Sequence, residues 1–213
     1  MKTKLTESLK KIEAAVELAE SKTSGEIVPI IYDKCSNTSF VFPFTFLCLF
    51  LIWNTFQDWY FPVNFWEVNL FLQLGFPLLI CGALSLFLSK SHRLQRLMIP
   101  RHRREKNTRE RAELEFFRSG IPQTKGRTGV LIFVSLMERW SVVLADEAIS
   151  QKLPAETWQE ILVILNSQIT ATDLALGLVP AIEKCGQLLS MHFPKDAQDI
   201  NELPNFPIFR LDC

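Results

Sequence analysis

Five oxygen-bearing side chains at the ends of predicted strands and in the C-terminal tail have the chemistry to bind a divalent cation. They are Asp33, Glu138, Asp146, Asn201 and Glu202. Ca²⁺ and Mg²⁺ are bound in proteins by several carboxylate and carbonyl oxygens that converge on one point. The set therefore predicts a Ca²⁺ or Mg²⁺ site if the fold brings these side chains together. Structural interpretations stand beside it: Asp146 precedes a predicted helix as an N-cap, and Glu138 lies in a turn as a solvated residue.

Phosphatase-type hydrolysis requires a nucleophile or a metal-activated water, together with cations that stabilise the phosphoryl group. The sequence contains neither a Cys-x5-Arg loop nor a P-loop, and its five cysteines are widely spaced. His92 and His102 lie in a basic stretch, where an interfacial position is more usual than catalysis. The third histidine, His192, ends a predicted helix as a cap or a packed residue. The sequence thus assigns no catalytic residue and predicts no cofactor other than the divalent cation.

Two long apolar runs interrupt the elements that must position these side chains. Residues 40–57 and 68–89 contain no Asp, Glu, Lys or Arg over 18 and 22 positions. As helices they would extend about 27 and 33 Å, which matches the roughly 30 Å thickness of a bilayer core. We expect both to be transmembrane helices. The alternatives are buried helices of a soluble core or, for the shorter first run, a re-entrant hairpin.

The charges next to these runs predict their orientation. The connecting residues 58–67 include Trp59, Tyr60 and Trp66, which are residue types typical of a membrane interface, and contain two acids but no Lys or Arg. Residues 89–118 contain ten Lys or Arg and only four acids. Since Lys and Arg favour the cytoplasmic side, we expect both termini in the cytoplasm and the aromatic connection on the far side of the membrane.

The basic residues after the second run are expected to lie against anionic lipid head groups. Those placed at the membrane interface are Arg93, Arg96, Arg101, Arg103 and Arg104. Their position directly after a predicted span favours lipid over nucleic acid, and we expect residues 90–118 to form one basic juxtamembrane helix. The balance of 23 basic and 23 acidic residues also argues against a generally basic nucleic-acid-binding protein. Spans without ionisable residues argue against a transporter.

The remaining residues, 1–39 and 119–213, predict one discontinuous cytoplasmic domain. Apolar residues at helical spacing over 5–20 predict an amphipathic helix, and residues 25–33 read as a strand in which Pro29 indicates a sheet edge or an irregularity. The later part of the chain predicts two strands joined by a turn, two helices, and a tail forming an ordered loop or short strand; these lie near 130–136, 141–146, 158–169, 174–192 and 198–213. The expected fold class is α/β, a small mixed β-sheet covered by helices and interrupted by a two-helix transmembrane hairpin.

The order of these motifs resembles the TPM domain family in its bacterial two-span form. SGEIVPI at 24–30 precedes the hairpin, and GRTGVLIFVSLMERWSVVLAD at 126–146 and NELP at 201–204 follow it. The resemblance covers nearly the whole chain and implies an α/β sandwich with a central mixed sheet, with the hairpin in a bacterial inner membrane. It also implies several activities: phosphatase activity and photosystem II repair in plant relatives, metal binding in bacterial ones, and receptor modulation in a nematode member.

The turn at 137–139 departs from the family pattern. In many relatives it reads Asp-Asp-Arg, so Glu138 and Arg139 match while Met137 replaces an acid, which weakens the implied metal site. We therefore expect a non-catalytic, membrane-tethered interaction or scaffold module that assists the assembly, turnover or regulation of other membrane proteins. The resemblance implies two alternatives, a phosphatase-like hydrolase and a divalent-metal-binding domain.

Overall fold

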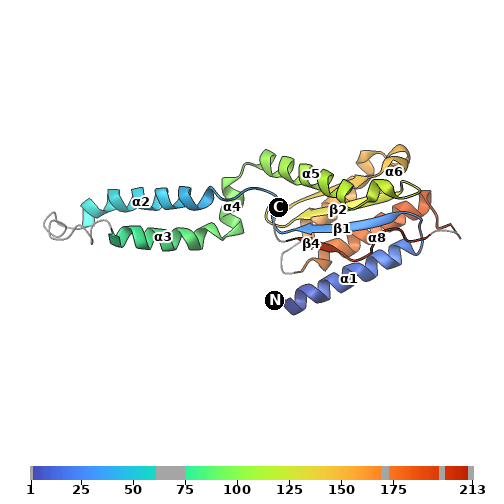
Figure 1. Ribbon diagram of the computed structural model, residues 1–213, viewed down its shortest axis with the longest axis horizontal. Coiled ribbons are helices and arrows are strands. Elements are labelled where there is room, and N and C mark those ends of the chain that lie inside the picture. Colours follow the sequence, from blue (N-terminus) through green and yellow to red (C-terminus); the bar gives the residue numbers. More distant parts are fainter. Residues whose placement is uncertain (1, 61–74, 169–172, 197–199, 211–213) are drawn as a thin grey trace. The chain divides into compact units, whose positions relative to one another are not determined.

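The computed structural model describes residues 2–60, 75–168, 173–196 and 200–210, and it contains two compact units. The first unit, called here the sheet domain, combines residues 1–36 with 101–213. The second, called here the helical unit, comprises residues 37–100. Figure 1 shows strands in the sheet domain, whereas the described part of the helical unit is made of helices.

A four-stranded mixed sheet forms the centre of the sheet domain. Its strands are β1 (Glu26–Tyr32), β2 (Gly129–Ser135), β3 (Trp140–Ala145) and β4 (Ile208–Arg210). The strand order is β3-β2-β1-β4, with β1 parallel to both β2 and β4, and β2 antiparallel to β3. The α/β class and the small mixed sheet are therefore confirmed, and the C-terminal tail contributes a short strand.

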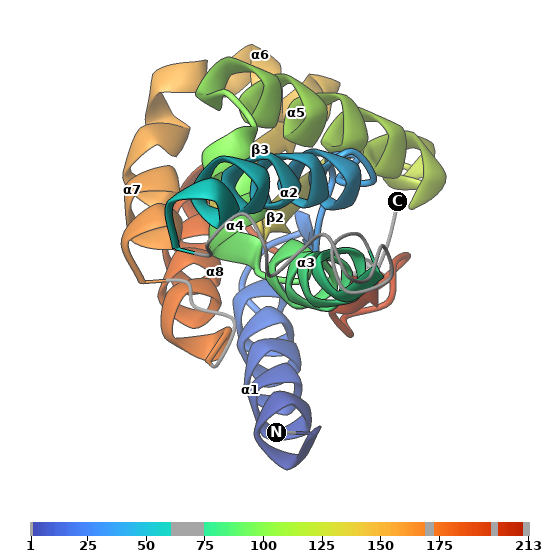
Figure 2. The same ribbon diagram turned by 90° about the vertical axis from the view of Figure 1, so that its left-hand side faces the viewer.

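Helices cover both faces of this sheet. One face carries α1 (Lys2–Glu20), α7 (Gln159–Gln168) and α8 (Ala175–His192), while α5 (Arg101–Arg118) crosses the other (Figures 1 and 2). Short helices α6 (Glu147–Lys152), η3 (Ile121–Gln123) and η4 (Ala155–Trp158) complete the connections. Side chains alternate along each strand, so the two faces of β1 and β2 enter two separate hydrophobic cores. Burial on both faces explains why these strands are apolar throughout.

Pro29 lies at an irregular position of the sheet rather than in an outer strand. The proline pairs with Ile132 inside β1, which is a central strand. However, β4 pairs only with residues 30–32, and the N–H of Ile27 donates instead to the Glu20 carboxylate at 2.8 Å. Pro29 is two residues further along and faces the same side, where no strand accepts a hydrogen bond. Its missing N–H therefore costs the sheet nothing.

The basic stretch 90–118 forms two helices rather than the single one expected. Helix α4 (His92–Met98) ends before Pro100, and α5 begins at Arg101. Ile99 is extended (φ −101°, ψ 118°), which is the conformation that a following proline imposes. Helix α5 belongs to the sheet domain, because Thr108, Ala112 and Glu115 are buried on its sheet-facing side. The expected domain boundary at residue 119 therefore moves to 101.

The helical unit contains an antiparallel hairpin of α2 (Val41–Tyr60) and α3 (Phe76–Ser89), followed by α4. Thr45, near the start of α2, hydrogen-bonds Ser85, near the end of α3, at 2.6 Å. The rings of Trp53, later in α2, and Phe76, at the start of α3, lie 6.4 Å apart, so the two helices run in opposite directions. The predicted second run, 68–89, and the loop 58–67 fall partly on residues 61–74, outside the described residues. Among the residues that the structure describes, no helix combines the length and apolar character needed to cross a membrane.

Candidate functional site

Glu138 lies at the end of the sheet where the chain leaves β1 towards the helical unit. It sits in the four-residue turn between β2 and β3, and the structure buries it, contrary to its interpretation as a solvated residue. The N–H groups of Leu136 and Met137 donate to the carbonyls of Tyr32 and Asp33, extending the parallel ladder past β1. The carboxylate of Glu138 then accepts two amides a little further along the chain.

These amides belong to Cys35 and Ser36, which donate to Oε1 of Glu138 at 3.0 and 2.7 Å. The hydroxyl of Ser135 donates to the other carboxylate oxygen. The Glu138 carboxylate therefore fixes the backbone at residues 35 and 36, just after the chain leaves β1. Glu138 thus supplies the hydrogen-bond acceptor just beyond the point where the backbone pairing of β1 ends.

The start of α5, where the chain re-enters the sheet domain, also contacts the turn between β2 and β3. Arg104, near the start of α5, donates to the carbonyl of Glu138 at 3.2 Å, and Asn107 donates to the hydroxyl of Ser36 at 3.0 Å. The guanidinium of Arg101 lies 5.4 Å from the ring centre of Trp140. Both chain connections to the helical unit are therefore fixed to the turn between β2 and β3. We call these contacts the neck.

The five predicted metal ligands lie at two opposite ends of the sheet. Asp33 and Glu138 follow the carboxyl ends of β1 and β2. Asp146 donates its N–H to Gly129 at the amino end of β2, and the N–H of Glu202 donates to the carboxylate of Glu26 at the amino end of β1. Seven residues of β2 separate the two ends by about 20 Å. One ion cannot contact both sets.

Each acid at the amino end has a structural role. The Asp146 carboxylate caps α6 by accepting the N–H of Glu147 at 2.7 Å, as its position in the sequence predicts. The Glu202 carboxylate accepts the N–H of Lys125, while the Asn201 amide donates to Asn205 at 2.6 Å. Among the described residues, no group of three or more His, Cys, Asp or Glu side chains is placed to hold a metal ion. The Ca²⁺ or Mg²⁺ site remains a prediction.

The surface of the α2–α3 hairpin is dominated by large apolar side chains. Leu79 and Phe87 on α3 are 70% and 77% exposed. The others, from both helices, are Phe42, Phe44, Leu47, Leu51, Ile52, Phe56, Phe76, Leu78, Ile80, Leu84 and Leu86. Contiguous exposed apolar surface of this kind marks a site of contact with protein or membrane.

Four polar side chains of the hairpin bond each other or its own backbone. Thr45 and Ser85 are buried and bond each other, and Ser85 also donates to the carbonyl of Phe42 at 2.8 Å. Asn54 and Thr55 donate to carbonyls one turn earlier in α2. The hairpin thus exposes large apolar side chains and encloses the Thr45–Ser85 pair.

The predicted interface residues are divided between the two units. Arg93 and Arg96 lie on α4 of the helical unit, whereas the other three arginines lie on α5 of the sheet domain. Of these three, Arg101 and Arg104 contact the neck and Arg103 is exposed. Trp59 and Tyr60 are the last residues of α2, and Trp66 lies outside the described part of the chain.

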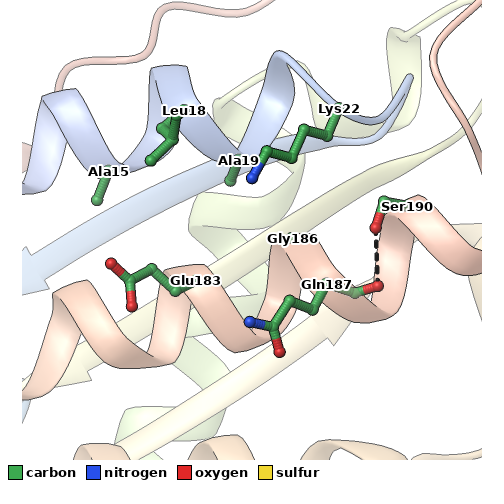
Figure 3. A pocket seen from close by; sticks show the side chains of 8 residues that line it. All are labelled: Ala15, Leu18, Ala19, Lys22, Glu183, Gly186, Gln187 and Ser190. Atoms are coloured by element: carbon green, nitrogen blue, oxygen red, sulfur yellow. Dashed lines mark hydrogen bonds between the residues drawn. The ribbon is translucent and has the colours of Figure 1, made fainter.

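A shallow groove of about 240 Å³ lies between α1 and α8 (Figure 3). Its walls come close because Ala19 faces Gly186, where an added Cβ would lie 2.6 Å from the Ala19 Cβ. The lining residues are Ala15, Leu18, Ala19, Lys22, Glu183, Gly186, Gln187 and Ser190. This mixture of small and flexible polar side chains supplies no nucleophile paired with a base. The groove is therefore a packing feature of two closely spaced helices.

A cluster of three arginines around one buried carboxylate was not predicted from the sequence. Glu115 of α5 accepts the hydroxyl of Tyr32 at 2.9 Å, and Arg111, Arg118 and Arg210 lie 3.8, 3.4 and 3.5 Å from its oxygens. We call these five residues the arginine cluster. One signal was available: Glu115 continues the helical spacing of Thr108 and Ala112, so the helix that was expected to lie against lipid head groups also has a buried face.

Tyr32 links the members of this cluster. Arg111 donates to its hydroxyl at 2.7 Å and lies over its ring, 4.8 Å from the centroid, while the ring of Phe133 stacks on it at 5.3 Å. Burial raises the pKa of Tyr32 above its ordinary value, and the bond to Glu115 acts in the same direction, whereas Arg111 opposes them. The folded protein therefore keeps this phenol protonated.

Replacing Tyr32 with phenylalanine should change the pH dependence of stability. The pKa of Tyr32 is higher in the folded protein than in the unfolded chain. Above about pH 10 the unfolded chain therefore loses the phenol proton while the folded protein keeps it, and the free energy of unfolding falls as the pH rises. Tyr32→Phe should lower stability by about 1–3 kcal/mol at neutral pH, because Glu115 loses a donor, and flatten this alkaline fall. Urea unfolding at pH 8 and at several values above 10 measures both effects. Equal alkaline slopes would refute the assignment.

No protein-family model matches the chain, and no curated protein matches it. Among solved structures, the chain is similar to the NMR structure of the BA42 protein from the psychrophilic bacterium Bizionia argentinensis. The two share 22% sequence identity with a TM-score of 0.58, and the match covers 96% of this chain and 94% of that one. At this level of identity the likeness extends to the fold: the protein has the same overall α/β architecture as BA42.

Proposed function

We propose that the protein is an integral membrane protein of the bacterial inner membrane, anchored by the α2–α3 hairpin. The observation that carries the proposal is the apolar surface of the hairpin, with Leu79 and Phe87 more than two-thirds exposed and the Thr45–Ser85 pair enclosed. Side chains that face lipid need no polar partners, while polar groups inside a bilayer must bond each other or the backbone. The hydrogen bonds of the hairpin follow this rule.

The sheet domain is proposed to be a TPM-like module on the cytoplasmic side. The excess of Lys and Arg after the second apolar run supports this orientation, with anionic lipid head groups as the partner of the exposed arginines Arg93 and Arg103. The neck supports a tethering role, because Glu138 and Arg104 fix both chain connections to the sheet domain.

Its function is proposed to be non-catalytic interaction with other membrane proteins, assisting their assembly, turnover or regulation. The alternatives, a phosphatase-like hydrolase or a divalent-metal-binding domain, have weaker support. Glu138, the acid retained from the family turn, already accepts three hydrogen bonds, and Asp146 caps a helix. The side chains that line the groove between α1 and α8 include no nucleophile paired with a base.

Cross-linking in intact membranes, followed by detergent extraction and purification of the full-length protein, tests this function. We expect specific membrane proteins to be recovered with the wild type, and to be lost when the hairpin is prevented from inserting. The same preparation should show no turnover of a generic phosphate ester. Robust hydrolysis without any recovered partner would favour the enzyme instead.

A further inference from the structure

We propose that the arginine cluster binds a phosphate dianion, either inorganic phosphate or a phosphomonoester. Arg118 comes from the last turn of α5 and Arg210 from β4, and they approach different oxygens of Glu115 at 3.4 and 3.5 Å. Their side chains are 59% and 48% exposed, whereas the side chain of Glu115 is buried. The cluster therefore presents two accessible guanidinium groups above an enclosed carboxylate.

The spacing of these two groups suits a tetrahedral anion. Because each contacts the same carboxylate, their contacting nitrogens lie within about 9 Å of each other. Two oxygens of one phosphate, about 2.5 Å apart and each accepting a charge-assisted hydrogen bond of about 2.8 Å, can bridge donors up to about 8 Å apart, which covers most of this range. Arginine also presents its donors as a planar fork that matches phosphate geometry.

Both arginines retain donors for such a ligand. Each guanidinium carries five N–H groups, and the contacts of Arg118 and Arg210 with Glu115 are longer than the 2.7–2.9 Å of a strong charged bond. The Oε1 atom of Glu115 already accepts the hydroxyl of Tyr32 at 2.9 Å. The carboxylate thus orients the two arginines without saturating them.

The charge of the cluster favours a doubly negative ligand. Three guanidinium groups face one carboxylate, and Arg111, held against the ring and hydroxyl of Tyr32, adds a fixed positive charge. Partial burial strengthens the interaction of these charges with a bound anion relative to water. The three arginines and Glu115 together carry a net charge of +2, which a dianion neutralises.

Titration of the full-length protein with inorganic phosphate in maltoside micelles, at constant ionic strength set with chloride, tests the site. We expect a saturable rise in Tm for the wild type, with the affinity at least about fivefold weaker in Arg118→Gln and in Arg210→Gln and no saturation in the double variant. Arg109→Gln should bind as the wild type does, because Arg109 is an exposed residue of the same helix that pairs with Glu113.

Absence of a saturable response in the wild type, or an unchanged response in the double variant, would overturn the proposal. If the glutamine variants unfold, the Arg118→Lys and Arg210→Lys pair keeps the charge and should bind phosphate several-fold more weakly, because lysine lacks the fork. Wild-type affinity in that pair would also count against the site.

The source of the phosphate is distinguished in nanodiscs. If the ligand is a lipid head group, discs containing phosphatidic acid should weaken the apparent affinity for inorganic phosphate relative to phosphatidylcholine discs. If it is a soluble phosphate, the affinity should be equal in the two kinds of disc.

Discussion

Replacing Leu79 and Phe87 together with glutamate is expected to release the full-length protein from membranes during alkaline extraction. Both side chains belong to the apolar surface of the hairpin. A charged side chain near the middle of a membrane helix costs about 2.5–3.5 kcal/mol on insertion scales, and less towards the ends. Two such charges on one helix should oppose insertion of the whole hairpin. The measurement is the fraction of protein in the pellet after carbonate treatment.

A matched pair in the sheet domain provides the control. Val163 on α7 and Met191 on α8 are also large, apolar and exposed. Val163→Glu with Met191→Glu adds the same charges outside the hairpin and should leave the protein in the pellet. Equal retention of the Leu79/Phe87 variant and the wild type would contradict insertion of the hairpin.

Glu138→Ala is expected to destabilise the sheet domain by about 3–5 kcal/mol. The carboxylate accepts two backbone amides and the hydroxyl of Ser135, and each buried donor left without an acceptor costs about 1–3 kcal/mol. The loss should appear first as cleavage near residues 33–36, where the neck opens. Denaturant unfolding together with limited proteolysis of the full-length protein measures both effects.

Two further variants separate the role of Glu138 as an acceptor from that of its charge. Glu138→Gln retains one carbonyl oxygen and should lose less stability than Glu138→Ala. Glu113→Ala removes an exposed carboxylate of α5 that pairs with Arg109, and should change stability by no more than about 0.5 kcal/mol. If Glu138→Ala were as mild as Glu113→Ala, the neck would not depend on this carboxylate.

The strands could be predicted from the sequence because their signals are local. Residues 130–136 and 141–146 are apolar runs separated by a short turn, and the structure pairs them as the β2–β3 hairpin. The strand order could not be predicted, because β4 has three residues and pairs with β1 across most of the chain. One side of β1 is unpaired at Pro29 for the same reason, because β4 begins only opposite Ile30.

The position of α5 and the role of Glu138 depend on contacts that lie far apart in the sequence. A basic helix next to a predicted span resembles a lipid-facing segment, and only its small buried residues Thr108 and Ala112 indicate packing on a sheet. Glu138 looks like an ordinary turn residue until Cys35 and Ser36 are placed beside it. Charged side chains that bond distant backbone amides have no periodicity to reveal them.

The depth of the α2–α3 hairpin in a bilayer is the most direct test of the membrane anchor. Spin labels on Leu79→Cys and Leu51→Cys, in a protein whose native cysteines are replaced and which is reconstituted in vesicles, report access to oxygen and to a water-soluble nickel chelate. A label on Val163→Cys in the sheet domain provides the aqueous reference. If the hairpin is inserted in the bilayer, both hairpin labels collide readily with oxygen and are shielded from nickel. Nickel access equal to that of the Val163→Cys label would contradict the membrane anchor.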